Sequence, residues 1–70
     1  MEISKPQQKV LDTMNENSGP FHFIPWGLNY YHLQDAGNNY NYLGRVRHCV
    51  FDALIKKELI VNNSIGWITK

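Results

Sequence analysis

The sequence predicts a small α+β domain with two long helices, an aromatic-rich middle segment and a C-terminal β-hairpin. Its 70 residues suit one domain with a single core, so we expect residues 1–70 to fold as one unit. Apolar residues recur at helical spacing near the start of the chain and again after residue 43. Two short extended runs, separated by a turn sequence, close the chain. Together these observations predict the fold class.

The first helix is expected from about Lys5 to Asn17. Ser4 is a suitable N-cap, Gln7 three residues later completes a capping box, and Pro6 lies in the first turn, where its missing N–H costs little. Three apolar residues share one face of this helix: Val10, Leu11 and Met14. The sequence Ser18-Gly19-Pro20 then ends it.

The middle segment, residues 20–43, holds seven of the nine aromatic residues and no Lys or Arg. Residues 21–23 alternate as a strand does, and Pro25 and Gly27 are expected to interrupt it. Residues 35–39 have turn chemistry, which favours a β-hairpin with strands at 30–33 and 40–43. The alternative is a short helix from Leu28 to Ala36 with Gly37 just past its end.

The second helix is expected from Leu43 to about Glu58. Its apolar face comprises Val46, Val50, Ala53 and Leu54. Residues 59–61 and 65–69 are extended and flank the turn Asn62-Asn63-Ser64, so this helix leads directly into a hairpin. That order of elements is typical of a winged helix.

Two end motifs carry a resemblance to a known family. They are Ser4-Lys5-Pro6-Gln7-Gln8 followed by Leu11 and Met14, and Val50-Phe51-x-x-Leu54-x-x-Lys57-x-Leu59-Ile60. Across residues 3–60 the chain resembles the small bacterial YjhX-like family, and its aromatic middle segment departs from that family's pattern. The resemblance implies a winged-helix-like domain and the toxin component of a toxin–antitoxin pair, with no catalytic residue to carry over.

Charge and helix geometry predict a regulatory, DNA-binding function. Residues 1–42 carry two basic and four acidic residues, and residues 43–70 carry five basic and two acidic residues, so the C-terminal part is the basic one. The face opposite Val46 and Val50 would contact double-stranded DNA together with the hairpin tip, although Asp52 lies within it. The predicted DNA-binding residues are Arg45, His48, Lys56, Lys57, Asn62 and Asn63.

The alternative function is a protein–protein interaction module, such as a toxin–antitoxin component or a phage-type inhibitor. Its interface would be the tyrosine-rich segment, because Tyr and Trp dominate interface hot spots. The predicted partner-binding residues are Trp26, Tyr30, Tyr31, Tyr40 and Tyr42. A platform for stacking nucleic-acid bases is disfavoured, because no cation lies between Lys9 and Arg45. A homodimer is expected, because so short a chain gains stability from association.

The sequence predicts neither a metal site, nor a cofactor, nor an enzyme. The soft metal ligands are His22, His32, His48 and Cys49, and they lack metal-binding spacing. Adjacent helical residues point about 100° apart, so His48 is poorly placed to activate Cys49. One cysteine and no long apolar run favour a cytoplasmic protein without a membrane segment.

Overall fold

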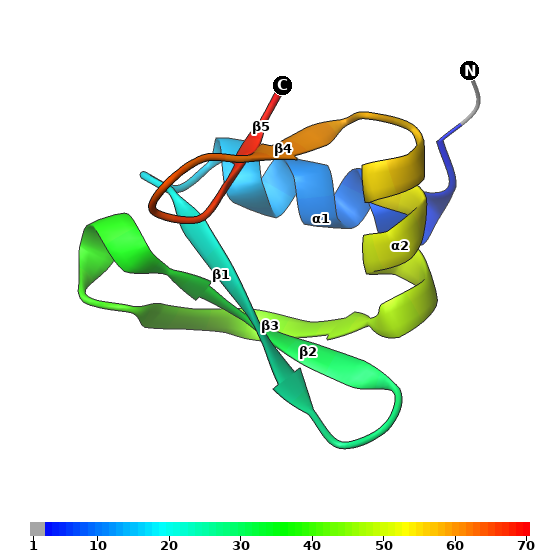
Figure 1. The fold of residues 1–70 in the computed structure, drawn as a ribbon, viewed down its shortest axis with the longest axis horizontal. Helices are drawn as coiled ribbons and strands as arrows, with labels where there is room; N and C mark the ends of the chain where they lie inside the picture. The colour runs from blue at the N-terminus through cyan, green and yellow to red at the C-terminus, as the bar shows by residue number, and fades with distance from the viewer. Residues whose placement is uncertain (1–2) are drawn as a thin grey trace.

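The computed structural model describes residues 3–70. Its elements are α1 (Lys5–Asn15), β1 (Phe21–Trp26), β2 (Tyr30–Asp35), the 3-10 helix η1 (Ala36–Asn38), β3 (Asn41–Arg47), α2 (His48–Lys56), β4 (Ile60–Asn62) and β5 (Trp67–Thr69). The five strands form one antiparallel sheet in the order β3-β2-β1-β5-β4. Both helices and the β4–β5 hairpin lie on one side of the β1–β3 strands (Figure 1).

The first helix is confirmed, and its predicted start is correct. The side chain of Ser4 accepts a hydrogen bond from the Gln7 backbone N–H, and the Gln7 side chain accepts one from the Ser4 backbone, so the capping box is present. The helix ends at Asn15, two residues before the expected end, with Glu16 as its C-cap. Its buried residues are the expected Val10, Leu11 and Met14.

The middle segment forms the expected hairpin, and the alternative helix at 28–36 is wrong. β2 pairs along its whole length with β1 and also pairs with β3. β1 continues through Pro25, contrary to the expected interruption, and Pro25 pairs with Tyr31. β1 pairs with β5 only at Phe21↔Trp67, so at Pro25 it has β2 as its one strand neighbour, and such an edge position tolerates proline.

The prediction that a helix begins at Leu43 is wrong, and so is the winged-helix fold. Residues 41–47 form β3, and α2 begins only at His48. Three antiparallel strands, all belonging to the five-stranded sheet, therefore separate the two helices. The apolar spacing between Val46 and Val50 suggested a helix, but Val46 lies between two exposed arginines and pairs across the sheet with Tyr31. This long-range pairing decides the conformation of the segment.

The core lies between the inward side of the sheet and the two helices. Its centre is Phe51, which stacks on Phe23 at a centroid distance of 4.3 Å and meets Tyr31 and Trp67 edge-on at 4.7 and 5.3 Å. The buried apolar residues are Val10, Leu11, Met14, Phe21, Phe23, Leu33, Val46, Val50, Phe51, Leu54 and Ile60. Residues from both helices and from four of the strands thus share one core.

One carboxyl group is fully buried beside this core. Asp35 Oδ1 accepts hydrogen bonds from the backbone N–H groups of Gly19 at 2.9 Å and Gly37 at 3.0 Å, and Oδ2 accepts one from Ser18 at 3.1 Å. The side chain therefore ties the α1–β1 connection to the β2–β3 turn. No unexplained buried polar side-chain atom remains in the part of the chain that the structure describes.

Candidate functional site

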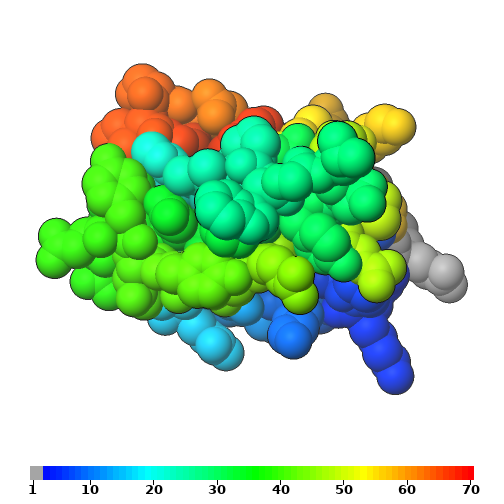
Figure 2. All heavy atoms as spheres, turned by 90° about the horizontal axis from the view of Figure 1, so that it is seen from below, coloured from blue at the N-terminus to red at the C-terminus, as the bar shows by residue number. Residues whose placement is uncertain are grey.

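The outward side of the β1–β3 strands carries a continuous set of aromatic and basic side chains. Residues paired across antiparallel strands project to the same face, so the register defines three rows. We call this surface the open sheet face. Its rows are His22, Gln34 and Tyr42; Ile24, His32 and Arg45; and Trp26, Tyr30 and Arg47. Figure 2 views the molecule from this side, and the cyan to yellow-green strands fill the middle of the view, with neither helix crossing them.

Three rings form a diagonal strip across this face. Trp26 stacks on His32, with a centroid distance of 4.4 Å and an interplanar angle of 20°. Tyr42 packs edge-on against His32, with a centroid distance of 5.0 Å. Trp26 is 61% exposed and Tyr42 is 52% exposed. The strip therefore holds its rings in place by mutual contact and still offers large aromatic surfaces to solvent.

Two arginines flank the strip. The guanidinium carbon of Arg45 lies 4.8 Å from the centre of the Tyr30 ring, which is cation–π geometry, and Arg47 lies opposite Tyr30 in the register. Both arginines are exposed. None of the nine residues of the open sheet face is acidic, and Asp35, at the end of β2, is buried on the inward side. The local charge of the face is therefore positive although the whole chain has a net charge of only +1.

Of the predicted DNA-binding residues of the second helix, His48 lines a hollow with Tyr30 and Arg47 at the border of the open sheet face, whereas Lys56 and Lys57 lie away from Arg45. Arg45 lies on β3, within the open sheet face. His48 pairs with Asp52 of its own helix at 3.1 Å, and its ring stacks near Tyr31. Lys56 is exposed at the far end of α2, and Lys57 donates a hydrogen bond from Nζ to Oε1 of Gln7 on α1 at 2.7 Å.

The predicted hairpin tip lies away from that helix. In Figure 1 the β4–β5 loop and α2 are at opposite ends of the view. Asn62 is exposed, and its backbone pairs with that of Trp67. Asn63 Oδ1 accepts hydrogen bonds from the backbone N–H groups of Ile65 at 2.9 Å and Gly66 at 2.8 Å, so this side chain builds the turn.

The predicted partner-binding tyrosines divide between two sides of the sheet. Trp26, Tyr30 and Tyr42 belong to the open sheet face. Tyr31 faces inward and packs against the core. Tyr40 lies in the turn before β3 with a φ of 57°, is 55% exposed and meets His22 edge-on at 5.4 Å. Tyr40 therefore borders the open sheet face without belonging to its rows.

Sequence reasoning missed His32 and Arg47 as members of this surface. The sequence disfavours a stacking platform because the aromatic segment contains no cation. In the structure, however, β3 brings Arg45 and Arg47 beside β2. The signal that could have found Arg47 is the period-2 alternation of residues 44–47, in which Arg45 and Arg47 share one face and Val46 takes the other. The same alternation in residues 30–33 places His32 on the face of Tyr30 and opposite to that of Tyr31 and Leu33.

The sequence predicts neither a metal site nor a membrane segment, and the structure bears on both. Among residues 3–70, no group of three or more His, Cys, Asp or Glu side chains is arranged to hold a metal ion. Neither α1 nor α2, the α-helices of that same stretch, is long and apolar enough to cross a bilayer.

Comparison with known proteins adds no relative. The chain matches no protein-family model, and no significant match was found among curated proteins or solved structures. The resemblance to the YjhX-like family therefore stays a prediction.

Proposed function

We propose that this protein binds single-stranded nucleic acid on its open sheet face. The observation that carries the proposal is the Trp26–His32–Tyr42 strip with two arginines beside it and no acidic residue among the nine of the open sheet face. Exposed aromatic rings on a sheet supply stacking surfaces for bases, and arginine supplies the contacts to phosphate.

Stacking of bases on these rings favours single strands over a duplex. Every base has two π-faces, but in a duplex those faces are occupied by neighbouring base pairs. Trp26 and Tyr42 lie on the two outer strands of the meander with His32 between them, so their rings are separated by about two strand spacings, roughly 9–10 Å. Two unstacked bases can therefore contact one ring each. Each such stack is worth about 1–3 kcal/mol.

The electrostatic contribution is smaller and can be measured separately. Contacts from Arg45 and Arg47 to two phosphates give a slope of about −1.4 in a plot of log affinity against log salt, since each contact contributes about −0.7 on a single strand. Affinity should therefore fall about sevenfold between roughly 50 and 200 mM salt. A basic channel with six or more contacts would show a much steeper dependence.

A protein partner is the second candidate for the same face. Trp, Tyr and Arg are enriched in interface hot spots and Lys, Asp and Glu are depleted, and the open sheet face has this composition. The two-arginine charge of the face suits such a partner as well. A homodimer, a regulatory role on double-stranded DNA and a cytoplasmic location remain further proposals.

The direct experiment follows the fluorescence of Trp26. Trp67 packs edge-on against Phe51 in the core, so Trp67→Phe keeps an aromatic ring there and leaves Trp26 as the only tryptophan. Oligothymidylate of about 12 nucleotides, within the usual site sizes, should quench Trp26 as it stacks. A duplex of equal length should quench it much less.

Matched variants locate the binding surface. Trp26→Ala should weaken binding of a labelled oligothymidylate about 5-fold to 150-fold, the equivalent of one lost stack. Arg45→Gln should weaken binding and halve the salt slope, whereas Lys56→Gln removes the same charge from the end of α2 and should change affinity less than about twofold. Absence of quenching at low salt, or equal losses in the two charge variants, would overturn the proposal in favour of a protein partner.

A further inference from the structure

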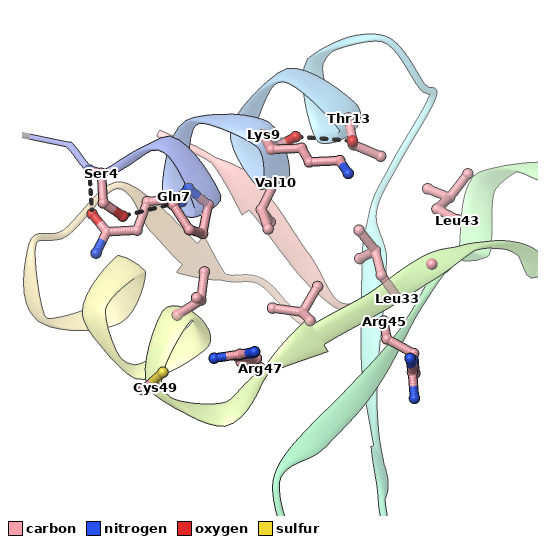
Figure 3. Close-up of a pocket in the computed structure, with 14 residues that line it drawn as sticks. Ser4, Gln7, Lys9, Val10, Thr13, Leu33, Leu43, Arg45, Arg47 and Cys49 are labelled. Carbon is pink, nitrogen blue, oxygen red and sulfur yellow. Dashed lines mark hydrogen bonds between the residues drawn. The ribbon is translucent and has the colours of Figure 1, made fainter.

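A second surface, which we call the edge groove, lies between α1 and the outer edge of β3 (Figure 3). Its volume is about 760 Å³. The apolar part of its lining comprises Val10, Leu33, Leu43, Val46 and Val50. Its apolar part is separate from the open sheet face, because Leu33 and Val46 face the inward side of the sheet, but Arg45 and Arg47 border both surfaces.

Gly44 leaves a part of the groove without a side chain. The register places Gly44 opposite Leu33, on the inward side, where a strand in this position would normally supply an apolar side chain. No atom lies within 4 Å of the point where a Cβ of Gly44 would be. Its φ of +129° is a conformation that other residues rarely adopt, so the chain is built to leave this place without a side chain.

The strand beside the groove is an edge strand. In the order β3-β2-β1-β5-β4, β3 has β2 as its one strand neighbour. Backbone groups on the other side of β3 can therefore pair with an added strand, which is a recurring mode of peptide recognition. Backbone pairing, an apolar pocket and room for one side chain thus occur together.

The charge of the groove selects among possible occupants. Lys9 on α1 and Arg47 on β3 lie along the groove (Figure 3), and Arg45, whose guanidinium carbon lies 4.8 Å from the centre of the Tyr30 ring, also lines it. Among residues 3–70, no Asp or Glu lines the groove. A second copy of this chain would bring the same basic side chains together, and like charges across an interface oppose association. An acidic partner is attracted instead.

We propose that the edge groove binds an extended acidic peptide segment, which adds a strand to β3 and inserts an apolar side chain beside Gly44. This peptide site is additional to the proposed nucleic-acid site, and it is centred on the apolar lining of the edge groove. It gives the protein a site for a partner protein with an acidic, strand-forming segment.

The experiment uses a fluorescein-labelled peptide of seven residues, the length of β3, that alternates glutamate and valine. Its anisotropy should rise with protein concentration, and a peptide that alternates lysine and valine should not bind. Lys9→Glu should weaken binding roughly fivefold to tenfold, since one attraction becomes a repulsion. Lys5→Glu is the matched control, because Lys5 is exposed on the same helix but does not line the groove.

Backbone pairing has its own test. Alternate N–H groups of an added strand point toward the edge, so N-methylation of every second residue in one register should abolish binding, and N-methylation in the other register should not. Equal binding of the two methylated peptides, or no binding of the parent peptide, would overturn the proposal. Sedimentation that shows a dimer dissociated by the peptide would also overturn it, by assigning the groove to a second copy.

Nuclear magnetic resonance separates this proposal from the first. The acidic peptide should shift the backbone amides of Val10, Gly44 and Val46 and leave the indole N–H of Trp26 in place. Oligothymidylate should do the reverse. Each binding proposal can therefore be contradicted without affecting the other.

Discussion

Substitution of Asp35 by Asn tests how much of the fold depends on one buried carboxyl group. Asp35 is fully buried and accepts three backbone hydrogen bonds, two on Oδ1 and one on Oδ2. Asn has the same shape but only one oxygen. If that oxygen takes the position of Oδ1, the amide NH₂ faces the N–H of Ser18, and two donors meet without an acceptor.

The expected loss follows from the bonds. One hydrogen bond to a charged acceptor, worth about 1.5–3 kcal/mol, disappears, and the bonds from Gly19 and Gly37 each weaken by about 1 kcal/mol when the acceptor becomes neutral. The total is about 3–5 kcal/mol. A chain of 70 residues has an unfolding free energy of roughly 3.5–10 kcal/mol, so Asp35→Asn should remove about a third of it or more.

Urea unfolding followed by circular dichroism measures this loss. With an m-value of about 1 kcal/mol per molar, the midpoint should fall by about 3 M or more, or the variant should be unfolded without urea. Asp12→Asn is the control, because Asp12 is exposed on α1 and accepts one side-chain bond, from Gln8 Nε2 at 2.8 Å. Its cost should be below about 0.5 kcal/mol. Similar midpoints for the two variants would refute the reasoning.

Three further substitutions probe the core and the C-terminal hairpin. Phe51→Ala should cost about 3–5 kcal/mol, since its ring contacts three other aromatic rings, and a melting curve close to that of the parent protein would contradict this. Asn63→Ala removes the acceptor for two backbone N–H groups and should cost about 1–2 kcal/mol in urea unfolding, and an unchanged midpoint would show that the turn forms without it. Gly66→Ala places a Cβ 2.5 Å from the Phe21 carbonyl oxygen and should cost about 1–3 kcal/mol, with faster amide exchange in β5, and unchanged exchange would exclude this clash.

The parts of the fold that the sequence predicted correctly are the ones set by local chemistry. Ser4 and Gln7 cap α1 within one turn, and residues 35–39 turn the chain between β2 and β3 by local means. Their physical causes lie within a few residues of each other, so they can be recognised in a single sequence.

The errors came where distant pairing outweighs local pattern. Val46 and Val50 have helical spacing, yet pairing of Val46 with Tyr31, fifteen positions earlier, makes residues 41–47 a strand and removes the winged-helix arrangement. The candidate site depended on the same pairing. Trp26, Tyr30 and Tyr42 were recognised by composition, but the cations beside them come from the next strand and not from the aromatic segment itself.

The single residue pair between β1 and β5 divides the sheet into two units of different cooperativity. The β1–β3 strands are joined along their length, whereas the C-terminal hairpin meets them at Phe21 and Trp67 and contacts α1 and α2 on its other side. Hydrogen exchange should therefore report two opening free energies. The His22 ring of the open sheet face is also hydrogen-bonded to the Ile65 carbonyl oxygen of the hairpin at 2.7 Å. A ligand on the open sheet face should therefore raise the opening free energy of β1–β3 more than that of the hairpin, and the difference between the two reports where the ligand binds.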